Sequence, residues 1–397
     1  MAMAEQVVKP DLEFVKEVVN NGGESLKKCY QCATCSVVCK VTPDDKPFPR
    51  KEMIHAQWGL KEKLLGNPDI WLCHQCSDCT AYCPRGAKPG EVLSAIRNLS
   101  IKKVAMIPFL AKVSQDPKLV WLLFAVPLAL FYIVMRFTHH ETMEFVRLGE
   151  NMDQMAYHMF IPIAPHMAAP ACLKWIFGLT ALFSLLSAFV GIQRLWSGMK
   201  IQAGGMKSGG SLSGDITSSV KTIITHSRFA DCNVNRLRKW GHMLLLYSFM
   251  GLAISGIWDL VYVYGNTILG IKPFLVFNFG EGPYPLTDPM KILSQISMIA
   301  FLIGIVIVLY NRLAKADKAG MGSYFDWIFL TVISGIGATG LLALVFRLAN
   351  ISAGYVAFYF HLVFVWLLLA YAPYSKFAHL FYRTTAMVFA KGAGREK

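Results

Sequence analysis

Hydrophobic residues are concentrated after position 118, where six apolar stretches follow a polar and charged N-terminal segment. The stretches cover residues 119–135, 175–192, 242–258, 292–310, 327–346 and 355–373. A helix needs about 20 residues, with a lower limit of about 17, to cross a bilayer, and with their polar flanks all six stretches reach that length. The pattern predicts six transmembrane helices rather than the buried helices of a soluble protein.

The composition supports a membrane domain, because 54% of the 397 residues are hydrophobic and the mean hydropathy is +0.42. A soluble protein of this length is ordinarily less apolar. Residues 1–20 are charged and have no apolar core, so they do not read as a secretory signal peptide. The net charge of +14 is better explained by membrane topology than by nucleic acid, since no basic helix or aromatic pattern of a nucleic-acid module is visible.

The charges of the loops predict the orientation, because lysine and arginine are retained on the cytoplasmic side. The loop between the second and third stretches carries the basic residues Lys200, Lys207, Lys221, Arg228, Arg236, Arg238 and Lys239. The loop between the first and second carries Glu141, Glu144, Glu150 and Asp153 against Arg147. We therefore expect a multi-pass protein of the cell inner membrane with both termini in the cytoplasm.

Two further segments are interpreted from their composition. Residues 91–118 are expected to form one amphipathic connecting helix whose basic side chains meet anionic headgroups at the membrane surface. Those side chains are Arg97, Lys102, Lys103, Lys112 and Lys118. Residues 204–214 are rich in glycine and serine and are expected to form a flexible loop.

Eight of the ten cysteines form two copies of the motif C-x2-C-x2-C-x3-C. The first copy is Cys29, Cys32, Cys35 and Cys39, and the second is Cys73, Cys76, Cys79 and Cys83. This is the pattern of bacterial two-cluster ferredoxins, in which the fourth cysteine of each motif binds the other cluster. We therefore predict one [4Fe–4S] cluster on Cys29, Cys32, Cys35 and Cys83 and another on Cys73, Cys76, Cys79 and Cys39. The first motif has Lys40 where the second has Pro84, which weakens the turn signal but not the number of ligands.

The alternative for these cysteines is a pair of structural zinc sites. Zinc sites normally use two separated C-x2-C knuckles, and the four closely linked cysteines of each motif do not fit that spacing. His74 lies inside the second motif and is expected to tune or pack against a cluster rather than to bind it. Cys172 is interpreted as a small apolar residue, and Cys232 is left unassigned.

Three histidines belong to the apolar stretches or their ends, and ionisable residues there commonly mark function. His361 and His379 are 18 residues apart, which on one continuous sixth helix is five turns on one face and ~27 Å of rise. His242 opens the third stretch at the depth expected for His379, so these two are predicted to share one iron. A single membrane histidine fits a hydrogen bond between helices equally well, but iron–sulfur clusters on the same chain favour haem b.

Two resemblances cover nearly the whole chain. The cysteine segments C-Y-Q-C-A-T-C-S-V-V-C at 29–39 and C-H-Q-C-S-D-C-T-A-Y-C-P at 73–84 resemble the iron–sulfur subunit of heterodisulfide reductase. The segment H-M-L-L-L-Y-S-F-M-G from His242, and the segment from His361 to His379, resemble the cytochrome b subunits of respiratory nitrate reductase and of membrane-bound heterodisulfide reductase. Such a fusion is similar to the membrane subunits of quinone-interacting membrane-bound oxidoreductase complexes of sulfate-metabolising prokaryotes.

The resemblance implies an all-α protein with a small di-cluster ferredoxin-like domain and a six-helix cytochrome b bundle. Its expected segments are 1–90 for the clusters, 91–118 for the connecting helix, 119–382 for the haem b domain and 383–397 for a cytoplasmic tail. It also implies an electron-transfer role in a quinone-linked oxidoreductase complex, exchanging electrons between menaquinone and adenylylsulfate reductase. The partners implied are cytoplasmic flavin and iron–sulfur proteins resembling the flavin-containing subunit of heterodisulfide reductase.

The sequence departs from this family at one position. The cytochrome b of nitrate reductase has a second histidine ten positions after the counterpart of His242, and this chain has Leu252 there. A distal haem on His361 is therefore five-coordinate, absent, or completed by an external-loop histidine, for which the candidates are His139, His140, His158 and His166. His226, in the segment T-H-S-R-F-A-D-C, is interpreted as a packing residue.

The expected path takes electrons from a quinol to a haem on His361, then to the haem between His242 and His379, and then to the clusters. The reverse direction uses the same residues. Trp258 and Asp259 are candidates for the quinone pocket, and a helix-capping role for Asp259 is equally compatible. The alternatives for function are a subunit of a heterodisulfide or sulfite reductase complex and, in another class, a metal-binding membrane scaffold or transporter.

Overall fold

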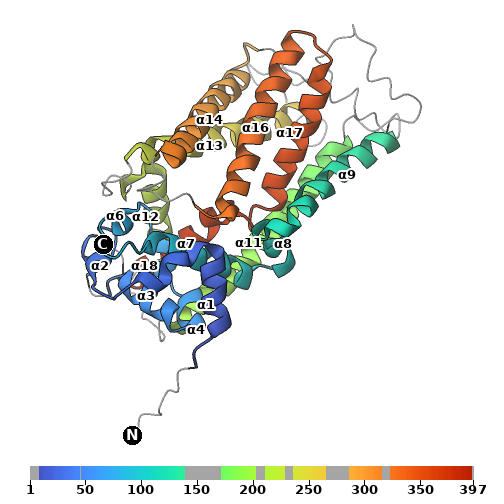
Figure 1. The fold of residues 1–397 in the computed structure, drawn as a ribbon. Helices are drawn as coiled ribbons and strands as arrows, with labels where there is room; N and C mark the ends of the chain where they lie inside the picture. The colour runs from blue at the N-terminus through green and yellow to red at the C-terminus, as the bar shows by residue number, and fades with distance from the viewer. Residues whose placement is uncertain are drawn as a thin grey trace.

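The computed structural model describes residues 9–44, 46–138, 171–202, 211–228, 236–264, 286–314 and 322–395. The part of the chain that it describes is helical and contains no strand, which confirms the all-α prediction. Short helices gather in the N-terminal part and long helices extend away from it (Figure 1). The helices of the N-terminal part are α1 Leu12–Val18, α2 Thr34–Val37, α3 Arg50–Gln57, α4 Lys61–Leu65, α5 Asp69–Leu72, α6 Asp78–Ala81, α7 Pro89–Val104 and α8 Pro108–Gln115.

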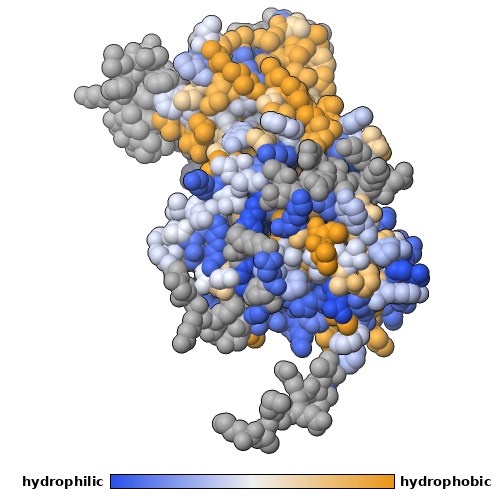
Figure 2. All heavy atoms as spheres, turned by 90° about the vertical axis from the view of Figure 1, so that its left-hand side faces the viewer, coloured by the Kyte–Doolittle hydropathy of each residue, from blue (hydrophilic) through white to orange (hydrophobic). Residues whose placement is uncertain are grey.

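Over the described ranges, six helices are long and apolar enough to cross a membrane, as predicted. They are α9 Val120–Thr138, α11 Ala171–Gln202, α13 Arg236–Tyr264, α14 Pro289–Ala314, α16 Tyr324–Leu348 and α17 Ala353–Ala370. Helix α13 packs against α14, α16 packs against α17, and α9 and α11 both contact α17. Their outer face is mostly hydrophobic, whereas the N-terminal part below is mostly hydrophilic (Figure 2).

Small residues set the close contact between α13 and α14. A Cβ placed on Gly251 of α13 would overlap the Ser297 Oγ of α14, and one on Gly304 of α14 would lie 3.2 Å from the Gly241 carbonyl oxygen. Residues without a Cβ let two membrane helices approach closely and pack their backbones. This contact fixes the N-terminal end of α13, where His242 lies.

The segment predicted as one connecting helix is two helices, α7 and α8, separated before Pro108. Proline favours the first helical turn and cannot continue a preceding helix, so a new helix starts there. The expectation that Arg97 meets lipid headgroups is wrong. Its side chain is buried, with Nε 2.6 Å from the Ile70 carbonyl oxygen and a further hydrogen bond to the Cys73 carbonyl. Helix α7 is thus a central element of the cluster-binding part.

The sixth spanning helix is not continuous with the helix that carries His379. Helix α17 ends at Ala370, a turn containing Pro373 follows, and α18, His379–Gly392, starts at the histidine itself. The missing N–H of Pro373 and the clash of its ring with the preceding turn end the helix. The predicted five-turn spacing between His361 and His379 on one continuous helix is therefore wrong, since His361 lies near the middle of α17 and His379 starts α18.

The C-terminal segment packs into the N-terminal part instead of forming a separate tail over its described residues. Tyr382 of α18 is fully buried, with its ring 5.5 Å from that of Trp71. Arg395 forms a two-point ion pair with the buried Asp69, at 2.8 and 2.7 Å. At the start of the same region Lys376 lies 2.7 Å from Asp326 of α16. These contacts join the cluster-binding part to the membrane helices.

Helix α12, Leu212–Thr225, is an additional element between α11 and α13 that the sequence pattern did not reveal. It packs against α18, and Lys391 Nζ donates a hydrogen bond to Ser218 Oγ at 2.6 Å. The helix ends at His226, whose backbone is left-handed with φ +50°. This end places the His226 ring beside α13.

Candidate functional site

The two cysteine motifs have the same backbone conformation. In each, the third and fifth positions have positive φ, namely Gln31 and Ala33 in the first motif and Gln75 and Ser77 in the second. A short helix follows in both, and the two helices, α2 and α6, lie against each other. Successive turns of this kind direct backbone N–H groups into the loop, where they stabilise anionic ligands. The duplicated sequence therefore folds into a duplicated anion-binding loop.

The pKa shifts of the buried cysteines relate thiols of one motif to thiols of the other. Burial, together with the neighbouring Cys29, Cys32 and Cys83, raises the pKa of Cys35 to about 11. Cys83 belongs to the second motif in sequence, yet it acts on the first. The crossed ligand assignment remains a prediction, and this neighbourhood favours it.

The second group shows the same crossing. Burial raises the pKa of Cys39 to about 12, with contributions from Cys73 and Cys76 of the other motif. Burial also raises the pKa of Cys79 well above its usual value, and Cys73, Cys76 and Cys39 add to the effect. Buried thiols of this kind lose their protons when a metal centre takes them as ligands. Within the described ranges no three such side chains converge on a single ion.

His242 and His379 lie together near the N-terminal end of α13 and the start of α18. Their ring centroids are 6.1 Å apart and their planes are inclined by 69°. Burial lowers the pKa of His379 to about 4, so this ring is neutral near pH 7. Its Nδ1 lies 2.7 Å from the Lys376 carbonyl oxygen. A carbonyl only accepts, so Nδ1 carries the proton and Nε2 is the nitrogen with the lone pair.

His226 holds the other imidazole of this pair. Its Nε2 is 2.8 Å from His242 Nδ1, and its Nδ1 is 3.3 Å from the Ile224 carbonyl oxygen. The carbonyl requires a proton on His226 Nδ1, and a neutral His226 then accepts at Nε2 from His242 Nδ1–H. Burial lowers the pKa of His226, which favours that neutral form. His242 Nε2 is thereby left as the lone-pair nitrogen, so the packing role expected for His226 is replaced by a positioning contact.

His361 has a similar arrangement near the middle of α17. Its Nδ1 is 3.2 Å from the Ile336 carbonyl oxygen and 3.3 Å from Thr339 Oγ1, both on α16. The ring lies over Gly340, where a Cβ would come within 3.0 Å of His361 Cε1. None of the histidines in the described part of the chain touches His361. The external-loop candidates His139, His140, His158 and His166 lie outside the described residues, as do Cys232 and the side chains of Cys172 and Asp259.

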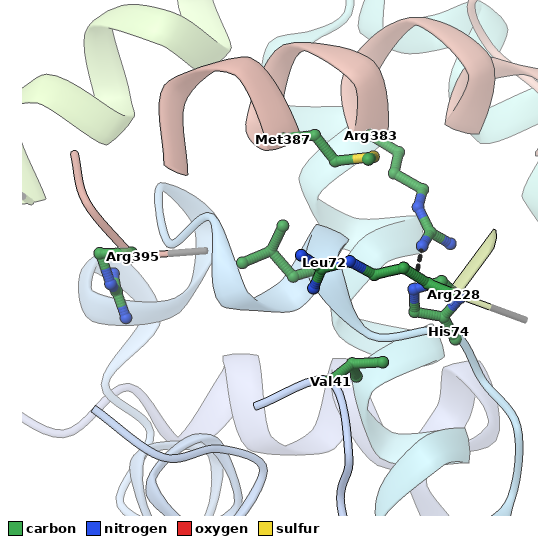
Figure 3. A pocket seen from close by; sticks show the side chains of 7 residues that line it. All are labelled: Val41, Leu72, His74, Arg228, Arg383, Met387 and Arg395. Carbon is green, nitrogen blue, oxygen red and sulfur yellow. Dashed lines mark hydrogen bonds between the residues drawn. The ribbon is translucent and has the colours of Figure 1, made fainter. Parts of the chain in front are cut away.

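Arg383 connects the helix of His379 to the second cysteine motif. It lies one turn after His379 on α18, and its Nη2 donates a hydrogen bond to His74 Nε2 at 2.8 Å (Figure 3). Burial, and then the nearby Arg383, lower the pKa of His74 well below its usual value, so the ring stays neutral and accepts this bond. Because His74 lies between Cys73 and Cys76, the contact ties α18 to a cluster-binding loop.

Arg238 makes the equivalent connection from the other histidine helix. It lies one turn before His242 on α13 and donates a hydrogen bond to the Gln75 carbonyl. Both arginines are four residues from a candidate haem ligand, and this spacing is visible in the sequence. Figure 3 also shows a small pocket beside this junction, lined by Val41, Leu72, His74, Arg228, Arg383, Met387 and Arg395.

Comparison with known proteins identifies the N-terminal part. Residues 25–87 match the family model of the 4Fe-4S dicluster domain. The C subunit of the H(2):CoB-CoM heterodisulfide,ferredoxin reductase of Methanothermobacter marburgensis is 35% identical over 101 residues, which are 25% of this chain and 53% of that protein. A protein of Archaeoglobus profundus that is described as similar to the heterodisulfide reductase C subunit is 36% identical over 95 residues, 24% of this chain and 49% of that protein.

The relatives match only one part of the chain, which spans about half the length of those curated proteins. The iron–sulfur C subunit of the CoB--CoM heterodisulfide reductase from Methanopyrus kandleri gives the same picture, with 34% identity over 105 residues and 55% of its length covered. No solved structure matches the chain. The N-terminal part of this chain is a 4Fe-4S dicluster domain homologous to the C subunits of heterodisulfide reductases, and six membrane-length helices follow it.

Proposed function

We propose that this chain is the membrane subunit of a respiratory oxidoreductase complex. In this proposal it transfers electrons between a membrane quinone and cytoplasmic partner subunits through haem b and two [4Fe–4S] clusters. The observation that carries the proposal is the position of the His242–His379 pair, since the helices of both residues also hold the Cys73–Cys76 loop. Such a junction places a membrane carrier beside a cytoplasmic one.

The described residues around this pair fit a haem. His242 and His379 have ring centroids 6.1 Å apart, and these two imidazoles would hold the haem iron, since neutral histidine is a common haem ligand. Apolar walls are present as well, because Phe377 packs against Phe249 of α13 with ring centroids 5.7 Å apart. Hydrogen bonds to Nδ1 of metal-binding histidines are the usual means of fixing their tautomer and orientation, and both rings have one.

Each part of the chain has a defined task in this proposal. When bound, haem and clusters supply one-electron carriers, while the protein binds them and sets their surroundings. The eight cysteines hold the clusters in the crossed pairing, Cys29, Cys32, Cys35 with Cys83 and Cys73, Cys76, Cys79 with Cys39. His226 and the Lys376 carbonyl orient the two haem-binding rings, and Arg238 and Arg383 keep the second cluster loop at the membrane surface. His361 is proposed as a ligand of a distal haem, and it is the one imidazole that the described part of the chain would supply to that haem.

The finer assignments follow from the family resemblance. We propose menaquinone as the quinone, a cytoplasmic flavin and iron–sulfur protein as the direct partner, and adenylylsulfate reductase in sulfate respiration as the enzyme served. A heterodisulfide or sulfite reductase complex is the nearest alternative, and the subunits that purify with the chain distinguish these. We also propose the cytoplasm for both termini, from the charges of the loops.

The cofactor content of the anaerobically purified chain tests this function. The proposal predicts two [4Fe–4S] clusters per chain by iron and acid-labile sulfide, and a b-type spectrum after dithionite reduction. One haem per chain means that only the His242–His379 site is filled, and two mean that the His361 site is filled as well. A chain with zinc, without sulfide and without haem would refute the proposal and support the metal-binding scaffold.

A further inference from the structure

The two cysteine groups have unequal surroundings. The second motif is covered, since Cys73, His74 and Cys79 are buried and arginines from the membrane-side helices hold the loop between them. The first motif faces solvent, since Cys32 is exposed. In Figure 1, α2 of the first motif lies at the outer edge of the N-terminal part, away from the spanning helices. The first group, which contains the exposed Cys32, is therefore the more accessible of the two to a soluble protein.

Large apolar side chains surround the exposed group. Tyr30, which follows Cys29, is 68% exposed, Val37 of α2 is 83% exposed, and Tyr82, which precedes Cys83, is 54% exposed. Exposed apolar groups that gather on one face of a domain mark sites of protein interaction. Two contacts bring these side chains to one face. Helix α2 lies against α6, and the Arg85 guanidinium lies 4.0 Å above the Tyr30 ring.

The rim of this apolar surface is basic. Five exposed cationic residues lie within three positions of a first-motif cysteine or of Cys83, or bond the first loop directly: Lys27, Lys28, Lys40, Arg50 and Arg85. Arg50 Nε is 3.1 Å from the Gln31 carbonyl oxygen, so its charge lies on the loop itself. Among the described residues of 24–50, the exposed carboxylates are Glu24 and Asp44. An apolar centre with a cationic rim complements a partner whose docking face is apolar and acidic.

We propose that this surface, the cluster-exit patch, binds the acidic face of a soluble flavin- or iron–sulfur-containing redox protein. The cluster-exit patch consists of Tyr30, Val37 and Tyr82 with Lys27, Lys28, Lys40, Arg50 and Arg85. One electron crosses per encounter, so that the partner's centre loses or gains one electron as the first cluster gains or loses it. The inference rests on the proposed function for the presence of the clusters, and it assigns which cluster meets the partner.

Reduced flavodoxin is a suitable probe, because it is a small acidic flavoprotein whose hydroquinone gives up one electron to form a coloured semiquinone. We would mix it anaerobically with the full-length oxidised protein in detergent and follow semiquinone formation by stopped flow. The variants are Lys28→Glu and Arg85→Glu on the rim and Val37→Ser at the centre. Lys221→Glu, an exposed charge reversal on α12, is the matched control.

The rim variants are expected to lower the second-order rate at least about fivefold at low salt and to approach wild type at high salt, because charged rims steer association. Val37→Ser is expected to lower the rate at both salt concentrations, and Lys221→Glu to leave it unchanged. Equal rates for the rim variants and wild type at low salt, with cluster content intact, would overturn the assignment. So would a wild-type protein that flavodoxin cannot reduce, or rim variants that change only the oligomeric mass, since a second copy would then occupy the patch.

This result is separable from the proposed function. The flavodoxin reaction reports on the first cluster alone and needs no haem. A chain that binds both clusters but no haem would therefore refute the membrane electron path while the patch could still be tested. A chain with haem and wild-type rates in every rim variant would refute the patch and leave the membrane path standing.

Discussion

Replacing His226 by leucine removes the group that accepts the His242 Nδ1 proton. In the structure His242 Nδ1 and His226 Nε2 are 2.8 Å apart, and His226 Nδ1–H in turn donates a hydrogen bond to the Ile224 carbonyl oxygen. A hydrogen bond of this kind makes the imidazole a stronger donor to its metal. A stronger donor stabilises ferric haem more than ferrous haem, so losing the bond should raise the midpoint potential of the haem that we propose between His242 and His379.

The size of the effect follows from the affinity change. Loss of such a partner typically costs about tenfold to 100-fold in metal affinity, and a tenfold change that falls on the ferric state alone is about 59 mV for a one-electron couple. We therefore expect His226→Leu to raise the potential by about 60 mV by the same relation. His226→Gln keeps an oxygen acceptor and should stay within about 20 mV of wild type.

Both variants carry a Cβ at a left-handed position with φ +50°, so they bear similar backbone strain and differ mainly in the acceptor. The assay is an optical redox titration of the purified protein, with haem content measured on the same samples. If leucine loses the haem and glutamine retains it, the hydrogen bond is required for occupancy as well. Equal potentials in wild type and both variants, with haem retained, would refute the role that we assign to His226.

Two further perturbations test the cluster-binding part. Burial raises the pKa of Glu52 to about 7, so the contribution of Glu52 to stability is complete below its unfolded pKa near 4.5 and is lost as the pH rises through about 7. Glu52→Gln should therefore raise the melting temperature by a few degrees at pH 8 and by less at pH 5. An equal change in melting temperature at both pH values would contradict this. Arg383→Ala removes the hydrogen bond that Arg383 donates to the buried His74, which costs about 1–3 kcal/mol of stability. The iron–sulfur absorption of this variant should therefore bleach faster in air than that of a Lys221→Ala control. Equal bleaching would show that the contact is dispensable.

The sequence was sufficient for the features set by length and composition. Six apolar stretches of spanning length predicted α9, α11, α13, α14, α16 and α17, because only a helix satisfies its backbone inside lipid. The cysteine spacing predicted a dicluster domain, since three thiolates two residues apart suit one corner of a cluster. Both predictions depend on local pattern alone.

Features that depend on tertiary contacts were missed or predicted wrongly. The break before His379 follows from Pro373, because proline ends the helix there even though the apolar residues around it suggest that the helix continues. Arg97 looked like a lipid-facing charge, but the carbonyls of the second cysteine loop needed a buried donor. The contact of His226 with His242 needed the position of α12, which no periodic signal revealed, whereas the four-residue spacing of Arg238 and Arg383 from the histidines was available in the sequence.

The most direct test of the account is whether the clusters exchange electrons with quinone through the histidine-bound haem. The protein would be reduced with dithionite, freed of excess reductant and mixed with a menaquinone analogue, while the reduced-cluster signal is followed by electron paramagnetic resonance. We predict rapid reoxidation in wild type and clusters that stay reduced in His379→Leu with cluster content unchanged. Reoxidation of the clusters at the wild-type rate in His379→Leu would contradict the account.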